Sequence, residues 1–110
     1  MRLSSKEIQA IMQVIAKNLS SCQYQLYLYG SRADDTLKGG DIDLLLLLEQ
    51  AVDKPIAERF RYKILAELKA QIGDQKIDLS IFSRSQLGQD AFLDMIFDTA
   101  KPLSHFKLGV

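Results

Sequence analysis

Several residue types that build common functional sites are nearly missing from this sequence of 110 residues. It contains one cysteine, one histidine and no tryptophan. Cys22 alone cannot form a disulfide within the chain, and with the single His105 it cannot build a zinc cluster. The composition therefore excludes a disulfide-stabilised scaffold and a structural zinc site.

The chain also lacks long apolar segments and an excess of charge. No apolar run reaches the ~18 residues that span a bilayer, and Met1 to Leu19 is charged and periodic, unlike a signal peptide. These features predict a cytoplasmic protein. Fourteen basic residues balance fourteen acidic ones, whereas nucleic-acid binders usually carry a basic face. A nucleic-acid partner is therefore not expected.

A single domain is expected over residues 1–110. At this length roughly two thirds of the unfolded surface can be buried, which is enough for a hydrophobic core without covalent cross-links. The hydrophobic fraction of 47% and the charged fraction of 25% are those of an ordinary globular domain.

Apolar periodicity predicts that helices and strands alternate along this domain. A capping box at Ser4 and Glu7 begins an amphipathic helix of about 15 residues. Strands are predicted at 23–29, 42–48 and 76–82, a long helix at 53–73 and a last helix at 87–100, with a short helix after Gly30. This order predicts an α/β fold with a small mixed sheet flanked by helices.

The C-terminal part of the chain has more apolar surface than its position explains. The predicted helix 87–100 is apolar on two faces, and the tail alternates Phe106, Leu108 and Val110. A helix of this kind is either fully buried or faces another chain, and an alternating tail is able to add a strand to an exposed sheet edge. We therefore expect a partner or dimer surface between Phe92 and Val110.

The stretch from Gly30 to Leu48 carries the main candidate site. Asp41 and Asp43 stand at the start of a run of five leucines, and alternate residues of a strand share a face. Two carboxylates within about 7 Å of each other repel unless a cation lies between them. Oxygen ligands favour magnesium over zinc. The pattern predicts a magnesium site at the beginning of this strand.

A glycine and a serine precede these two acids and predict a phosphate-binding turn. Gly30 can adopt backbone angles that let the chain approach a ligand closely. Ser31 opens a predicted short helix, whose free N–H groups favour phosphate. A phosphate turn beside a magnesium site suits a metal-bound nucleoside triphosphate.

A third acid, Asp78, lies in the predicted strand 76–82. Ile77, Leu79 and Ile81 share one face of this strand, and Asp78 shares the other face with Ser80. A carboxylate in the middle of a strand is costly to bury without a partner. We therefore expect this strand to lie beside 42–48 and to direct Asp78 toward the magnesium site, although a surface-facing acid is the simpler alternative.

These residues resemble the signature of the nucleotidyltransferases of the DNA polymerase β superfamily, and the chain length is similar to that of the minimal nucleotidyltransferases. Many of these are antitoxins paired with a helical HEPN-domain toxin. Gly30 and Ser31 match the glycine-serine of the family, Asp41 and Asp43 match its metal-binding pair, and Asp78 best matches its third carboxylate. The resemblance implies the polymerase β-like nucleotidyltransferase fold.

The resemblance covers 24–82 and includes two departures. The spacer between the serine and the first acid has nine residues, where ten is common among the antitoxins. Asp34 and Asp35 occupy positions where many relatives carry arginine and glycine. Two acids near a triphosphate would weaken its binding unless they point away from it. Arg32 is a candidate for neutralising phosphate charge.

The resemblance implies a magnesium-dependent enzyme with ATP as co-substrate, transferring AMP to a hydroxyl, with tyrosine favoured, of a partner HEPN toxin. The three acids would bind metal and catalyse, and Gly30, Ser31 and Arg32 would bind the nucleotide. Two alternatives remain open: a non-catalytic antitoxin that masks a HEPN ribonuclease, and a transferase acting on a small molecule such as an aminoglycoside. An active-site cleft needs two walls, and a chain of this length is expected to form only one. A homo-oligomer is therefore also compatible with the sequence, because a second copy could supply the other wall.

Overall fold

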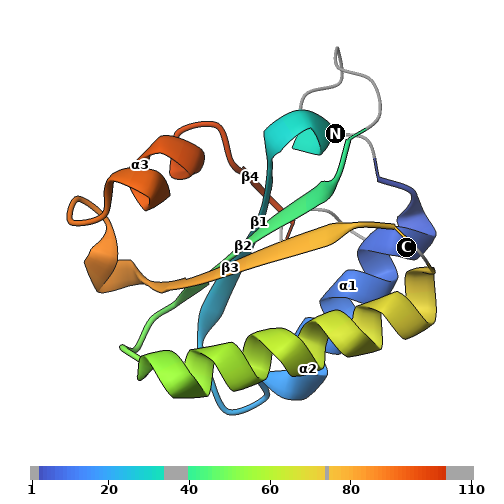
Figure 1. The fold of residues 1–110 in the computed structure, drawn as a ribbon, viewed down its shortest axis with the longest axis horizontal. Coiled ribbons are helices and arrows are strands. Elements are labelled where there is room, and N and C mark those ends of the chain that lie inside the picture. Colours follow the sequence, from blue (N-terminus) through green and yellow to red (C-terminus); the bar gives the residue numbers. More distant parts are fainter. Residues whose placement is uncertain (1–2, 34–39, 74, 104–110) are drawn as a thin grey trace.

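Four strands form a mixed sheet in the computed structural model, which describes residues 3–33, 40–73 and 75–103 (Figure 1). The strands lie in the order β3-β2-β1-β4, with β1 antiparallel to both β2 and β4, and with β2 parallel to β3. The predicted mixed sheet flanked by helices is confirmed. The elements are α1 (Ser5–Asn18), β1 (Tyr24–Tyr29), η1 (Gly30–Ala33), β2 (Ile42–Leu48), α2 (Lys54–Ile72), β3 (Ile77–Ser83), η2 (Arg84–Gln86), α3 (Ala91–Phe97) and β4 (Lys101–Pro102).

Strand β2 is an inner strand of the sheet, and both of its faces are buried. Alternate leucines of β2 belong to two separate core clusters, one on each face of the sheet. Apolar side chains on both faces can be satisfied only when helices cover the strand from above and below. The residues with no exposed surface in β2 are Ile42, Leu44, Leu45, Leu46 and Leu47.

Helices α1 and α2 both pack on one face of the sheet (Figure 1). The predicted capping box begins α1: the Ser4 hydroxyl accepts a hydrogen bond from the Glu7 N–H, and the Glu7 carboxylate accepts one from the Ser4 N–H. Ile11 and Ile15 of α1 and Ile64 and Leu68 of α2 are buried against the sheet. This layer supplies most of the core.

The opposite face is covered only in part, by the short helix α3. Leu93 and Ile96 of α3 pack on Leu45 and Leu47, and the ring of Phe97 meets Tyr27 edge-on at a centroid distance of 5.3 Å. A seven-residue helix is about 10 Å long, whereas a seven-residue strand is about 23 Å long. Within the described residues, α3 therefore leaves the N-terminal end of β2 uncovered on this face.

The prediction of a helix over 87–100 is wrong at both ends, because α3 covers only Ala91–Phe97. Gly88 has a φ of +82°, which an α-helix cannot include. The helix begins instead after Asp90, whose carboxylate accepts a hydrogen bond from the Leu93 N–H. A fourth strand, β4, follows α3, and the sequence analysis did not predict it.

The two apolar stripes of the last helix have different surroundings. Leu93 and Ile96 are buried, whereas Phe92 and Met95 are 47% and 64% exposed. The predicted alternating tail, 106–110, lies outside the described residues. In the part of the chain that the structure describes, no helix is both long and apolar enough to cross a membrane.

Candidate active site

Three side chains form a row across the sheet at its uncovered end. In the strand register, Tyr29 of β1 is the partner of Asp43 of β2, and Asp43 is the partner of Asp78 of β3. Residues that are partners across adjacent strands point to the same face of a sheet. The expectation that β3 lies beside β2 and brings Asp78 next to Asp43 is confirmed.

The carboxyl group of Asp43 is the most perturbed acid in this row. Partial burial, together with the negative charges of Asp78 and Asp41, raises the pKa of Asp43 to about 6, against a smaller opposing effect of Lys76. Two neighbouring carboxylates disfavour each other's charge, and a cation bound between them would relieve this repulsion.

Gly30 brings the backbone into contact with this acid. The residue has a φ of +77°, and a methyl group added to its Cα would overlap Oδ2 of Asp43 and lie 3.3 Å from Cγ. No side chain fits between η1 and the Asp43 carboxylate. Because only glycine accepts both this φ and this contact, the turn after β1 is held directly against the metal-ligand candidate.

Asp41 lies at the outer end of the acidic group and has a cationic neighbour. The Lys76 ammonium is 3.5 Å from Oδ2 of Asp41 and is 72% exposed. An exposed pair of this kind contributes little stability. Its position matters more, because it puts a mobile positive charge beside carboxylates that would otherwise repel a phosphate.

Tyr29 forms the β1 end of this row and lies on the face of the sheet that α3 partly covers. Its hydroxyl lies 3.4 Å from the Ser80 hydroxyl, so the side chain extends from β1 across β2 to β3. Burial, together with Asp43 and Asp78, raises the pKa of Tyr29 above the usual value of 10.0, against the bond with Ser80. The phenol is neutral at pH 7 and forms a wall beside the two acids.

The remaining predicted site residues belong to η1 and the loop after it. Ser31 and Arg32 lie in η1, directly after Gly30, and their side chains are outside the described residues. Asp34 and Asp35 also lie outside that part of the chain. Lys76, Tyr29 and Ser80 were not predicted as site residues. Lys76 precedes Asp78 by two positions, and that spacing places both on one face of an extended strand.

The carboxylates suit a magnesium ion that is shared with a nucleotide. Within 3–33, 40–73 and 75–103, no three acidic, histidine or cysteine side chains are close enough to hold an ion alone. Magnesium is usually bound by one or two carboxylates, with phosphate oxygens and water completing the octahedron. The adjacent acids Asp43 and Asp78, with Asp41 nearby, provide such a donor set.

Comparison with protein families places the chain in a known class. A family profile described as nucleotidyltransferase domain matches residues 9–101. The chain therefore belongs to the nucleotidyltransferase domain family. No curated protein sequence matches the chain.

Three solved structures with a similar fold are toxin–antitoxin complexes. One holds a tri-AMPylated HEPN toxin of Shewanella oneidensis with an MNT antitoxin; the similarity has a TM-score of 0.58 at 20% identity, over 88% of this chain and 68% of that chain. A mutant of the MntA-HpeT toxin–antitoxin gives 0.62 at 18%, over 92% and 72%. A toxin–antitoxin with AMP-PNP gives 0.62 at 21%, over 87% and 71%. These similarities concern the fold.

Proposed function

We propose that this nucleotidyltransferase is an antitoxin that transfers AMP from magnesium-bound ATP to a hydroxyl, with tyrosine favoured, of a HEPN-type partner toxin. The observation that carries the proposal is the register of Asp43 with Asp78, on adjacent strands beside the Gly30 turn. It joins a metal-binding pair to a backbone turn suited to phosphate. The similar complexes, which contain a tri-AMPylated HEPN toxin or AMP-PNP, support the choice of donor and partner.

In the proposed reaction the acceptor oxygen attacks the α-phosphorus of ATP, a P–O bond forms, and the bond to pyrophosphate breaks in line with it. Asp41, Asp43 and Asp78 would hold magnesium, which supplies charge stabilisation for the entering and leaving oxygens. Asp78 would also polarise the acceptor hydroxyl and take up its proton.

The turn after β1 would bind the leaving part of the nucleotide. The backbone N–H groups at Gly30 and Ser31 would hold the β- and γ-phosphates, and Arg32 would neutralise part of their charge. Lys76, beside Asp41, would add a second cation at the outer end of the site. In this arrangement none of the proposed phosphate-binding groups lies beside Asp78, where the acceptor hydroxyl would bind.

The acceptor is proposed to be a partner protein because the described fold forms only one side of a cleft. Besides the sheet and its three α-helices, the described residues form only two short 3-10 helices and the connecting loops. On the face that carries the acids, α3 packs on Leu45 and Leu47 at the far end of β2. Nothing among the described residues therefore forms a second wall opposite Asp43 and Asp78.

The first prediction concerns the metal. ATP should bind measurably with magnesium and at least about tenfold more weakly without it, because three neighbouring carboxylates repel a bare triphosphate. Isothermal titration calorimetry at pH 7.5, with magnesium or with EDTA, measures the difference. Equal affinity under both conditions would contradict the proposed metal site.

The second prediction tests the transfer itself. Incubation with magnesium, ATP and the HEPN-type protein encoded by the neighbouring reading frame should add one or more AMP groups to that protein, as seen by intact mass spectrometry. The variant Asp41→Asn/Asp43→Asn should add none. A partner that is silenced but never gains mass would show instead that the chain is a binding antitoxin without transferase activity.

A further inference from the structure

The two edges of the sheet are protected to very different degrees. Edge strand β4 has only two residues, Lys101 and Pro102, and short edges with lysine or proline resist pairing with other chains. Edge strand β3 has seven residues, IDLSIFS, with no proline and no lysine. Within the described residues β3 has no strand on its outer side. The edge beside Asp78 is therefore the one open to a further strand.

The direction of the free backbone groups of β3 follows from its pairing with β2. The Ile42 N–H donates to the Lys76 carbonyl, and in a parallel pair the even-numbered residues of β3 then face β2. The odd-numbered N–H groups point outward. The outward N–H of Ser83 confirms this direction, because it donates to the Gln86 side chain at 2.9 Å. Ile77, Leu79 and Ile81 remain as outward donors.

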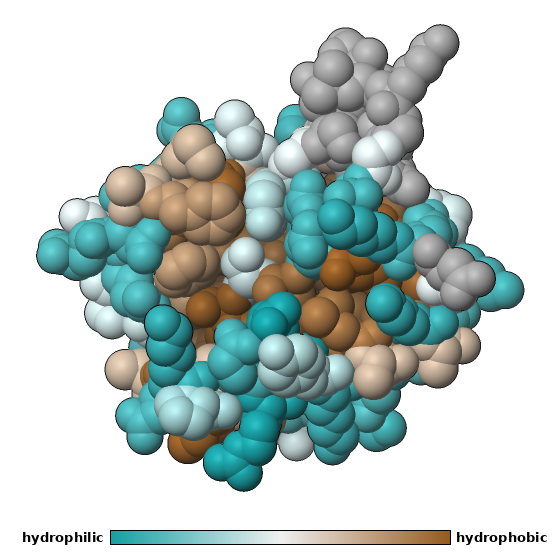
Figure 2. Space-filling view, viewed as in Figure 1, coloured by the Kyte–Doolittle hydropathy of each residue, from teal (hydrophilic) through white to brown (hydrophobic). Residues whose placement is uncertain are grey.

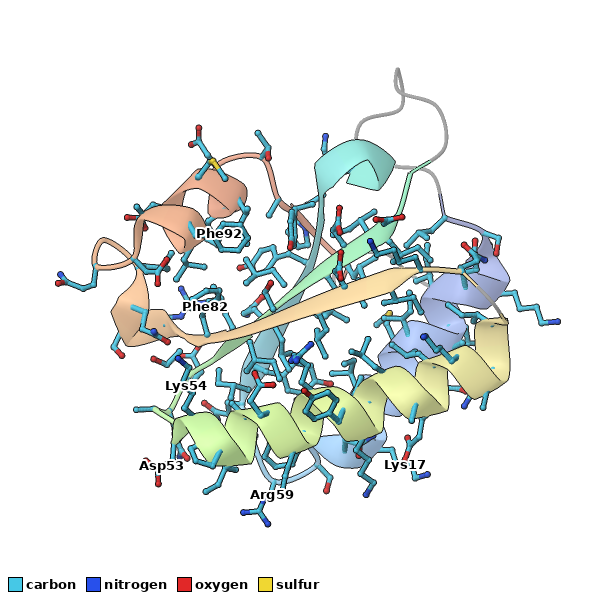
Figure 3. All side chains as sticks on the ribbon, in the orientation of Figure 1. Lys17, Asp53, Lys54, Arg59, Phe82 and Phe92 are labelled. Atoms are coloured by element: carbon cyan, nitrogen blue, oxygen red, sulfur yellow. The ribbon has the colours of Figure 1, made fainter. Side chains whose placement is uncertain are left out.

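A groove runs along this edge. It has a volume of about 540 Å³ and lies between Leu79 to Phe82 of β3 and the first half of α2, where Lys54, Glu58 and Arg61 line it. Figure 2 shows apolar side chains exposed on this face between hydrophilic ones. Lys54 and Phe82 border the groove at the end away from the acids (Figure 3). Its other end reaches Leu79, one residue from Asp78.

We propose that the acceptor is an extended segment of the partner protein that pairs with the outer edge of β3 and presents a tyrosine opposite Asp78. This inference rests on the proposed function and names how its acceptor binds. Hydrogen bonds at Ile77 and Leu79 would place the residue between them opposite Asp78, on the same face and about 4.5 Å away between Cα atoms. Extended backbone is the occupant that fits, since its carbonyl groups can accept from all the alternate outward donors at once.

The reach of a tyrosine in this geometry is visible within the protein. The Tyr29 side chain begins on β1 and passes over β2, and its hydroxyl lies 3.4 Å from the Ser80 hydroxyl on β3. A tyrosine on a strand added outside β3 would pass over β3 in the same way, so its hydroxyl would lie between Asp78, the proposed base, and Asp43 on β2. A serine at that position is too short to reach the space between these two acids. The lateral distances therefore favour a tyrosine hydroxyl as the attacking group.

Hydrogen exchange of the backbone amides tests this docking mode without relying on turnover. With the HEPN-type protein from the neighbouring reading frame added, the amides of Ile77, Leu79 and Ile81 should gain more than about tenfold protection in NMR exchange. Asp78, Ser80 and Phe82, already bonded to β2, should change little. Uniform protection of all six amides, no protection, or protection that depends on the concentration of this chain alone would overturn the proposal.

A pair of variants connects the edge with transfer. Ile81→Pro removes an outward N–H, whereas Ile81→Ala trims the same side chain and keeps the N–H. Ile81→Pro should transfer AMP to the partner about tenfold more slowly than Ile81→Ala, while both bind magnesium-ATP equally. Transfer without alternate protection would overturn the edge docking and leave the proposed function standing. Alternate protection without transfer would support the docking and contradict the transferase activity.

Discussion

Replacing Asp43 with asparagine should abolish nucleotidyl transfer and at the same time stabilise the metal-free protein at pH 7. Asparagine keeps the shape but cannot supply the charge that holds magnesium, so we expect a loss of about 10³-fold or more in rate, similar to the removal of a single transition-state stabiliser. The amide removes the repulsion from Asp78 and Asp41 and can donate a hydrogen bond to Asp78. Activity and stability should therefore move in opposite directions.

The stability change has a defined pH dependence. Asp43 has a pKa of about 6 in the folded chain, against an ordinary value of 3.8. Between about pH 4 and pH 6 the folded protein thus holds a proton that the unfolded chain has lost. This group favours folding below that window, and its contribution is lost as the pH rises through about 6. With allowance for solvent screening, the loss is on the order of 1–2 kcal/mol.

Thermal melts of the metal-free protein between pH 4 and pH 8 measure this difference. At pH 7 Asp43→Asn should melt about 5 °C above the wild type, and the gap should close toward pH 4. Asp53→Asn, which removes the same charge from an exposed position before α2, serves as the control and should shift neither activity nor this pH profile. An Asp43→Asn variant that melts below the wild type at pH 7 would show that repulsion between the acids does not destabilise the fold.

Gly30→Ala should cost both stability and activity, although it removes no catalytic group. The added methyl group overlaps Asp43 and also requires a φ of +77°. We expect a loss of about 2–4 kcal/mol in the free energy of unfolding and a loss of activity of about 100-fold or more, because the carboxylate proposed to bind the metal is displaced.

Two other glycines separate the effect of φ from the effect of the contact. Gly73 and Gly88 have φ values of +84° and +82°, and nothing lies within 4 Å of a methyl group added at either. Gly88→Ala should therefore cost only about 1 kcal/mol and retain transfer activity. Denaturant unfolding and the transfer assay, applied to both variants, give the comparison. Equal losses in Gly30→Ala and Gly88→Ala would show that the contact with Asp43 is unimportant.

The strands that carry the acids could be predicted closely because local pattern and tertiary burial agree there. The short leucine run after Asp43 and the alternation around Asp78 are both typical of buried strands, and β2 and β3 lie within a residue of the predicted ranges. The alternation placed Asp78 on one face with Ser80, and the pairing of β3 with β2 brings that face into line with Asp43. The capping box of the first helix was also readable, since all its interactions are local.

Other features depend on contacts between distant segments. β4 has only two residues and includes Pro102, so no pattern in the sequence predicts a strand there. It is defined by its pairing with Tyr27 and Leu28. The start of α3 is set by the Asp90 cap and by Gly88, within a stretch whose apolar spacing suggested a longer helix. Tyr29 joins the candidate site through the register of β1 with β2. The sequence places it only beside Gly30.

The burial of β2 on both faces also determines how the candidate site responds to heat. Local opening events with low free energy occur at frayed ends and poorly packed segments, whereas a central strand with fully buried leucines exchanges only when the whole domain unfolds. We therefore expect the leucine segment of β2 that follows Asp43 to open only together with the whole domain. Warming should leave the acid geometry intact up to the temperature at which the domain unfolds, so the thermal limit of the chemistry is the thermal limit of the fold.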